Sequence, residues 1–186
     1  MDLETVKSDI ERVIVTADDI DTRLAELARQ VERDLEGEVP LLVGVLRGAV
    51  MVMADFSRHL TLHVDMDWMA LSSYGDGVES SGEVKILKDL DTSMEGRHVL
   101  IVEDIVDTGL TLSWLLQNFQ SRGAASIRVL TLLRKPDAMK IDVPIDYVGF
   151  DIPNAFVVGF GLDYAGRYRN FTSVGVLKPE VYSSGA

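Results

Sequence analysis

The sequence predicts an α/β fold in which a central, mostly parallel twisted sheet is flanked by helices. Short apolar runs such as Val99 to Val102 have the length and composition of strands buried on both faces. Segments with apolar residues at helical spacing lie between these runs, as expected for parallel strands joined by helices. At 186 residues, 47% of them hydrophobic, the chain fits one domain with a sizeable core.

The composition excludes several classes of protein. Lys and Arg number 18 against 30 Asp and Glu, so the net charge of −12 repels nucleic acids and anionic membranes. There is no cysteine, which excludes disulfides and thiolate metal sites and is compatible with a reducing cytoplasm. The first residues are acidic and lack the apolar core of a signal peptide. The apolar stretch from Val39 to Ala54 is shorter than the ~20 residues of a membrane span and carries Arg47 in its middle. We expect a cytoplasmic protein that binds neither nucleic acid nor membrane.

The N-terminal segment predicts a strand and a helix. Arg12 to Val15 reads as a short strand or an extended arm. Thr16 is a candidate helix N-cap, with Asp19 three residues further on in a capping-box arrangement. The helix after it should bury Ile20, Leu24, Leu27, Val31 and Leu35.

A buried strand over Val39 to Leu46 is followed by Arg47 and Gly48, and then by an apolar helix from Ala49 to Leu60. The arginine is either a solvated turn charge or, with the backbone of its loop, a bidentate holder of pyrophosphate. The residue pattern alone leaves both open.

The next strand is His63 to Leu71, and Val84 to Leu87 is expected to pair with it in a hairpin. The segment between them, Ser72 to Glu83, holds three glycines and four serines and cannot pack a core. It is either a simple hairpin tip or a lid that closes over a substrate.

The most informative stretch follows the buried run Val99 to Val102. Glu103 and Asp104 stand where that strand leaves the sheet, and Asp107-Thr108-Gly109 precedes an amphipathic helix. That helix is marked by Leu112, Leu115, Leu116 and Phe119. Ligands of open α/β sheets bind at such a strand end, and the free N–H groups of a helix start favour phosphate. Carboxylates beside an anion site suit a ligand that also offers ribose hydroxyls and Mg²⁺, such as a phosphorylated sugar.

Two further strands are expected, at Ser126 to Leu133 and at Ile145 to Phe150. The first delivers Arg134 and Lys135 to the sheet edge, where a cation is either solvated or able to donate to a carbonyl oxygen of a ligand. The glycines between Ile152 and Asn170 are too irregular for a dinucleotide fingerprint.

The run from Val102 to Thr111 resembles the phosphoribosyl pyrophosphate (PRPP) motif of the purine phosphoribosyltransferases, within the type I phosphoribosyltransferase family. The residues of this motif are most similar to those of the bacterial hypoxanthine (hypoxanthine-guanine) branch, and the similarity extends from about Val39 to Tyr182. The resemblance implies the type I fold, with residues 1–186 as a single domain that acts as a homodimer or homotetramer. Its expected parts are a core at about 38–150, a hood from about 1–20 and 150–182, and a flexible catalytic loop at about 72–83.

The resemblance also implies residue roles. The implied ligands of PRPP and its phosphates are Leu46, Arg47, Gly48, Glu103, Asp104, Ile105, Val106, Asp107, Thr108, Gly109, Leu110, Thr111 and Arg169. The implied purine-binding residues are Lys135, which reads the 6-oxo group, Phe156, which stacks, Val157, whose backbone reads the base edge, and Asp163. The implied catalytic residues are Asp107, Ser73 and Tyr74. The implied magnesium ligands are Glu103, Asp104 and Asp163. Many members carry Lys where this chain has Arg47, which keeps the charge and alters the geometry.

The implied reaction transfers 5-phosphoribosyl from PRPP to hypoxanthine or guanine through an oxocarbenium-like transition state, giving a nucleotide and pyrophosphate. Xanthine-, adenine- and orotate-specific enzymes share the motif, and a nucleic-acid-binding regulator on the same fold is a further alternative, which the net charge disfavours. Asp107-Thr108-Gly109 is also the aspartic-protease tripeptide, but a second copy is lacking. No Gly-x-x-x-x-Gly-Lys-Ser/Thr motif of P-loop enzymes is present.

Overall fold

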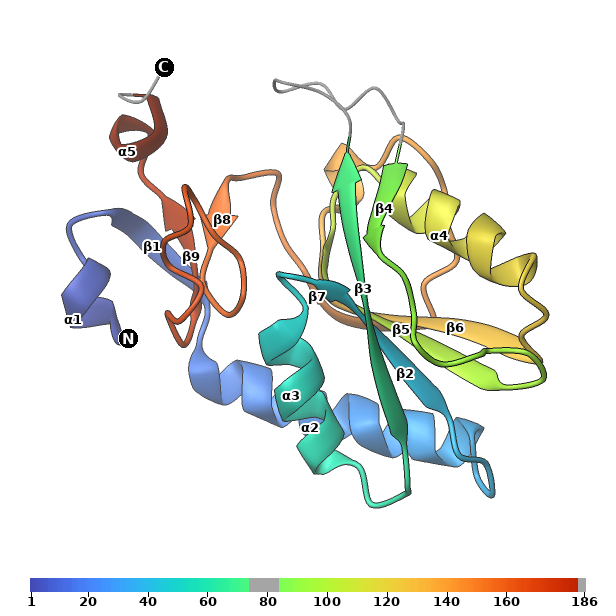
Figure 1. Cartoon of the computed structure of the whole chain (residues 1–186). Coiled ribbons are helices and arrows are strands. Elements are labelled where there is room, and N and C mark those ends of the chain that lie inside the picture. The colour runs from blue at the N-terminus through green and yellow to red at the C-terminus, as the bar shows by residue number, and fades with distance from the viewer. Residues whose placement is uncertain (74–83, 184–186) are drawn as a thin grey trace.

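The computed structural model describes residues 1–73 and 84–183. Its main feature is a six-stranded sheet in the order β4-β3-β2-β5-β6-β7 (Figure 1). The strands are β2 (Leu41–Leu46), β3 (Asp65–Ser73), β4 (Val84–Lys88), β5 (His98–Val106), β6 (Ser126–Arg134) and β7 (Tyr147–Asp151). All neighbouring pairs are parallel except β3 and β4, which form the expected hairpin. The predicted mostly parallel α/β sheet is confirmed.

Helices cover both faces of this large sheet. α2 (Ala17–Asp34) and α3 (Val50–His59) lie on one face, and α4 (Leu110–Gln120) lies on the other (Figure 1). β5 contributes Leu100 and Val102 to the core beneath α2 and α3, and Val99 and Ile101 to the core beneath α4. The strand is therefore buried on both faces, as its apolar run predicts.

The capping box of α2 is present. The Thr16 side chain accepts from the Asp19 N–H at 3.2 Å, and the Asp19 carboxylate accepts from the Thr16 N–H at 3.2 Å. All the apolar residues expected on the inner face of the helix are buried. The local sequence therefore determines where α2 begins and which side it buries.

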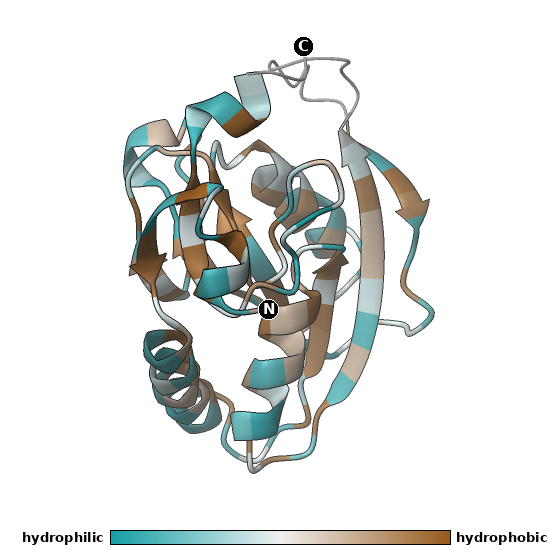
Figure 2. Cartoon of the chain, turned by 90° about the vertical axis from the view of Figure 1, so that its left-hand side faces the viewer, coloured by the Kyte–Doolittle hydropathy of each residue, from teal (hydrophilic) through white to brown (hydrophobic). Residues whose placement is uncertain are grey.

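A second, smaller sheet joins the two ends of the chain in the order β1-β9-β8, with antiparallel pairing. Its strands are β1 (Ile10–Val15), β8 (Val157–Val158) and β9 (Val174–Leu177). Figure 2 shows its strands as largely hydrophobic, and they enclose a core with Val158, Phe171 and Leu177 at its centre. Short helices complete the described chain: α1 (Leu3–Val6), the 3₁₀ turn η1 (Pro136–Ala138) and α5 (Pro179–Ser183). β8, β9 and the short helices were not assigned from the sequence.

Some predicted strands begin two residues too early. β2 starts at Leu41 because Val39 is exposed and Pro40 has no N–H to donate. The Pro40 carbonyl instead accepts from the N–H of Asp65, which fixes the start of β3. Within the described residues, no helix has both the length and the apolar composition of a membrane span.

Candidate active site

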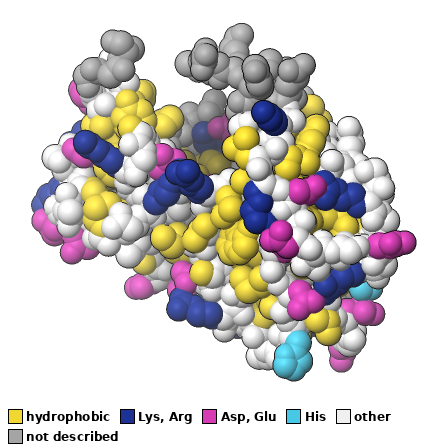
Figure 3. All heavy atoms as spheres, in the orientation of Figure 1, with side chains coloured by type: hydrophobic (Ala, Val, Ile, Leu, Met, Phe, Trp, Pro, Cys, Tyr) yellow, Lys and Arg dark blue, Asp and Glu magenta, His cyan; other side chains and the backbone are white. Residues whose placement is uncertain are grey.

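Three loops meet at one edge of the large sheet because β2, β5 and β6 run parallel and end there. They are residues 46–48, residues 103–111 and residues 134–136. Figure 3 shows a hollow between the small-sheet part and the large sheet, with basic and acidic side chains along its walls. The hollow lies over this edge, so the loops identified in the sequence surround one candidate site.

The loop after β5 forms a small cavity at the start of α4. The cavity has a volume of about 110 Å³ and is lined by Glu103, Ile105, Val106, Asp107, Thr108, Gly109, Thr111 and Leu112. Gly109 caps the helix with a φ of +81°, and a Cβ there would lie 2.8 Å from the carbonyl oxygen of Ile141. Glycine is therefore required by both conformation and space. The N–H groups of the first helical turn make this cavity suited to a phosphate.

Glu103 and Asp104 point to opposite faces of the sheet, as successive residues of a strand must. Glu103 lines the cavity beside α4. Asp104 points to the other face, where its carboxylate fills the space in which a Cβ on Gly48 would lie. The two carboxyl groups therefore lie in different parts of the site.

Glu103 is buried and Asp104 is half-buried, and neither forms an ion pair within the described residues. Burial raises the pKa of Glu103 well above its usual range, and the charge of Asp104 adds to the rise. Burial also raises the pKa of Asp104 to about 6, although the N–H of Ile105 donates to it at 2.9 Å and Arg169 lowers it from a distance. No described residue donates a hydrogen bond to the Glu103 carboxylate. Such a pair is costly unless a ligand supplies hydrogen bonds or positive charge.

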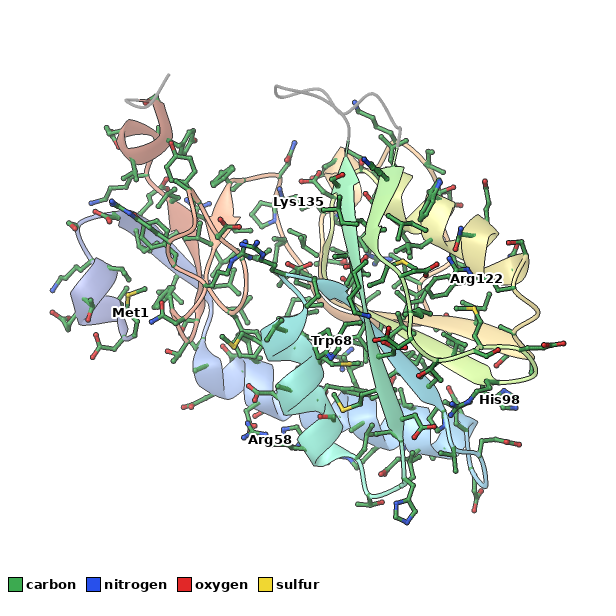
Figure 4. All side chains as sticks on the ribbon, viewed as in Figure 1. Met1, Arg58, Trp68, His98, Arg122 and Lys135 are labelled. Carbon is green, nitrogen blue, oxygen red and sulfur yellow. The ribbon has the colours of Figure 1, made fainter. Side chains whose placement is uncertain are left out.

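Lys135 connects the loop after β6 to the loop after β5. Its N–H donates to the carbonyl oxygen of Val106 at 3.0 Å, and its ammonium donates to the Asp107 carboxylate at 2.8 Å. The Lys135 side chain is buried, whereas that of Asp107 is 47% exposed. Figure 4 shows Lys135 at the ends of the large-sheet strands, on the side of the small sheet. Arg134 points elsewhere and forms a bidentate ion pair with Asp151 at 2.7 and 3.0 Å, so the two cations are distinguished by geometry.

The small sheet reaches the site through the turn that contains Gly161. A Cβ at Gly161 would collide with the carbonyl oxygen of Gly48, so the two backbones are in direct contact. Arg169 donates to the Gly161 carbonyl at 2.7 Å and pairs with Asp163 at 2.6 Å. The N–H of Gly166 donates to the other Asp163 oxygen at 2.8 Å. Asp163 and Arg169 therefore lie together, close enough to Asp104 that both influence its pKa.

Arg47 stands apart from this cluster. Its side chain is exposed and makes no hydrogen bond or ion pair with the described residues. The Leu46–Arg47 peptide bond is cis. The backbone of the loop is packed into the site, while its guanidinium remains available to a ligand.

Phe156 and Val157 come from the small sheet. The connection that carries them begins beside Lys135, because the N–H of Ile152 donates to the Arg134 carbonyl at 2.8 Å. Val157 is buried in β8, whereas Phe156 is 43% exposed as a residue, which is unusual for a large aromatic side chain. Tyr164 and Tyr182 surround that ring at centroid distances of 5.8 and 5.1 Å. Neither tyrosine was identified from the sequence, where no motif or spacing marks them.

Of the other two predicted catalytic residues, Ser73 is described only in its backbone and Tyr74 is not described. The backbone of Ser73 ends β3 opposite Val84, while Tyr74 and most of the predicted flexible loop lie outside the described residues. Among the described residues, no group of three or more acidic or histidine side chains could hold a metal ion by itself. A metal at this site would need oxygen atoms from a ligand or water in addition.

Comparison with known proteins agrees with this geometry. The family model of the phosphoribosyl transferase domain matches residues 16–165 of this chain. A hypoxanthine-guanine phosphoribosyltransferase of Bacillus subtilis is 52% identical over 179 residues, which cover 96% of this chain and 99% of the relative. One from Streptococcus thermophilus is 50% identical over 178 residues, covering 96% of this chain and 99% of the relative.

Solved structures show the same architecture. The crystal structure of a hypoxanthine phosphoribosyltransferase from Staphylococcus aureus has a TM-score of 0.92 to this chain at 44% identity, covering 96% of this chain and 97% of the other. The resemblance seen in the motif from Val102 to Thr111 thus extends over nearly the whole sequence and fold. The chain belongs to the phosphoribosyltransferase family, in its hypoxanthine-guanine branch.

Proposed function

We propose that this protein is a purine salvage enzyme that transfers the 5-phosphoribosyl group of PRPP to hypoxanthine or guanine, releasing pyrophosphate. The observation that carries the proposal is the 2.8 Å contact between Lys135 and Asp107. Asp107 lines the cavity at the start of α4, which suits a phosphate, and the buried Lys135 ammonium beside it can donate to the 6-oxo group of a purine. The relatives described above bear names with the same activity.

PRPP would lie across the edge of the large sheet. Its 5′-phosphate fits the cavity at the start of α4, where backbone N–H groups and the Thr108 and Thr111 hydroxyls can donate. Glu103 and Asp104 can accept from ribose hydroxyls, which would satisfy two carboxyl groups that are otherwise poorly paired. Arg47 and Arg169 can neutralise the departing pyrophosphate.

The carboxylates of the site fit a magnesium ion. The half-buried Asp104 carboxylate lies near Asp163, and its pKa is raised to about 6, so a nearby cation would favour the ionised form. Mg²⁺ is commonly held by one or two carboxylates together with substrate phosphates and water. Glu103, Asp104 and Asp163 are the candidate residues, directly or through water. When bound, the ion would offset the charge of PRPP and of the leaving pyrophosphate.

The base would meet Lys135, Phe156 and Asp107. Lys135 can donate to the purine O6, which favours 6-oxo over 6-amino bases. Phe156 presents a partly exposed ring on which a purine can stack, and the Val157 backbone can read the base edge.

The chemistry follows from these positions. The bond from the ribose anomeric carbon to pyrophosphate breaks as purine N9 bonds to that carbon, through an oxocarbenium-like transition state. The purine N7 proton goes to Asp107, a general-base role worth roughly 10²–10⁴-fold. In the free chain the Lys135 ammonium lies against that carboxylate, and transfer of this donor to O6 would free Asp107 to act. The segment with Ser73 and Tyr74 would shield the reaction from water.

We further propose that residues 1–186 act as one domain, with the small sheet as a hood over the site. We also propose that the protein forms a homodimer or homotetramer and acts in the cytoplasm. This rests on the resemblance to the family and on the absence of cysteine.

The direct test is an initial-rate assay with PRPP and Mg²⁺ against hypoxanthine, guanine, xanthine, adenine and orotate. We expect turnover of hypoxanthine or guanine to exceed that of the other bases by at least about ten-fold, because losing a matched polar contact costs roughly 1–3 kcal/mol. Turnover of adenine or orotate alone would refute the proposed base class. Nucleic-acid binding at low salt without transfer would favour the regulator.

Asp107→Asn should lower kcat by about 10²–10⁴-fold because the amide cannot accept the N7 proton. The variant should keep the circular dichroism spectrum and the thermal midpoint of the wild-type protein. Asp137→Asn, an exposed acid on the turn after Lys135, serves as a control and should keep full activity. Near-normal turnover by a folded Asp107→Asn protein would remove that residue from its assigned role.

Lys135→Ala should raise the KM for hypoxanthine by about ten-fold or more and change the KM for PRPP much less, because a charged hydrogen bond is worth roughly 1.5–3 kcal/mol. Arg134→Ala is the matched control, since the neighbouring cation pairs with Asp151 instead. Equal effects of Lys135→Ala on both substrates would contradict a base-reading role.

Asp104→Asn should stabilise the ligand-free protein at neutral pH. Because the folded state raises the Asp104 pKa from 3.8 to about 6, the folded wild-type protein binds a proton more tightly between these pH values. Its stability therefore falls as the pH rises through this window. The variant should match wild type near pH 4 and exceed it by on the order of 2–3 kcal/mol above pH 6. Urea unfolding without Mg²⁺ or PRPP measures this, and a difference that does not vary with pH would contradict it.

A further inference from the structure

Three aromatic rings, those of Phe156, Tyr164 and Tyr182, form a cluster beside the small sheet. Phe156 and Tyr182 lie 5.1 Å apart between ring centroids at 33°, a tilted stack. Tyr164 contacts Phe156 edge-on at 5.8 Å and 88°, and lies 6.4 Å from Tyr182. Such pairs stabilise one relative ring orientation. The cluster therefore fixes how the Phe156 ring stands.

The backbone alone leaves that orientation open. The Phe156 carbonyl accepts from the N–H of Leu177 at 2.9 Å, which fixes its main chain beside β9. The residue is nevertheless 43% exposed, so a packed interior does not hold its ring in one orientation. The neighbouring tyrosine rings supply the missing constraint.

Tyr182 is held on a fixed support although α5 is only one turn long. The N–H of Lys178 donates to the Asp9 carbonyl at 2.9 Å, and its ammonium donates to the Ser8 carbonyl at 2.6 Å. Val181 packs on the same small core as the N-terminal Val6. In Figure 1, α5 lies on the side of β8 away from the large sheet. These contacts hold the segment that carries Tyr182, whose ring centroid lies 5.1 Å from that of Phe156.

We propose that Tyr182 is a positioning residue for the purine: it covers one face of Phe156 and holds the ring so that its other face can stack on the base. This inference rests on the proposed function, in which Phe156 stacks on the purine. It adds a specificity element that the PRPP motif does not contain.

The ring of Tyr182, rather than its hydroxyl, carries this role. The interactions found for Tyr182 within the described chain are its two ring contacts, its apolar packing and its carbonyl oxygen, which accepts from the Tyr164 hydroxyl at 3.4 Å. Phenylalanine should therefore replace it, and a residue without an aromatic ring should not.

The experiment measures steady-state constants and thermal midpoints for wild type, Tyr182→Ala, Tyr182→Leu and Tyr182→Phe. Val181→Ala is the matched control, since it loosens α5 without removing a ring from Phe156. We expect Tyr182→Ala and Tyr182→Leu to raise the KM for hypoxanthine by about three- to ten-fold, the range expected for one aromatic pair. The KM for PRPP should change less than two-fold, and Tyr182→Phe should restore wild-type values. If the alanine variant does not fold, the leucine variant supplies the comparison.

The outcomes separate this inference from the proposed function. An equal rise in both KM values, or the same pattern in Val181→Ala, would show that Tyr182 only supports the fold and would overturn the inference. Wild-type protein that transfers no phosphoribosyl group would refute the proposed function and this role with it. An active wild type with an unaffected Tyr182→Leu variant would refute the role of Tyr182 alone.

Discussion

The structure depends on the burial of β5 on both faces. Leu100 and Val102 enter one core and Val99 and Ile101 enter the other, so the strand lies in the centre of the protein. Where this apolar run ends, Glu103 and Asp104 are still largely surrounded by protein, and burial raises the pKa of both. The core that stabilises the sheet thereby creates the electrostatic character of its ligand edge.

This arrangement sets stability against function. Two adjacent carboxyl groups with little compensating charge oppose folding of the free chain, as buried ionisable groups do. The same groups are ready to accept hydrogen bonds or to face a cation, because the site does not have to give up existing partners for them. Lys135 and Asp107 show the other solution, in which the free chain pairs its two charged groups. In the proposed reaction, a ligand would supply partners to the first pair and would have to separate the second.

The small sheet supplies the other wall of the site. Its strands come from both ends of the sequence, and its loop packs Gly161 directly against Gly48. This close approach requires the absence of a side chain at Gly161, whereas the absence of one at Gly48 leaves room for the Asp104 carboxylate. The same loop brings Arg169 and Asp163 near Asp104. The aromatic cluster belongs to the same wall. In our proposal, Tyr182 acts on the site through Phe156, although it belongs to no sequence motif.

The sequence by itself determined the features that depend on neighbouring residues. The apolar run Val99 to Val102 predicted the buried strand, and Thr16 and Asp19 predicted the start of α2. The stretch from Glu103 to Thr111 predicted the strand end and the helix start that line the cavity. Periodicity, capping and the free N–H groups of a helix start operate over a few residues, so they can be read directly.

Only the tertiary structure decided the contacts between distant segments. Lys135 lies against Asp107, Gly161 against Gly48, and Tyr182 against Phe156, each pair from separate parts of the chain. Burial, and with it the raised pKa of Asp104, is likewise a property of everything packed around a group. Such contacts depend on how the two sheets are positioned, because the chain folds back on itself over distances that no local pattern encodes.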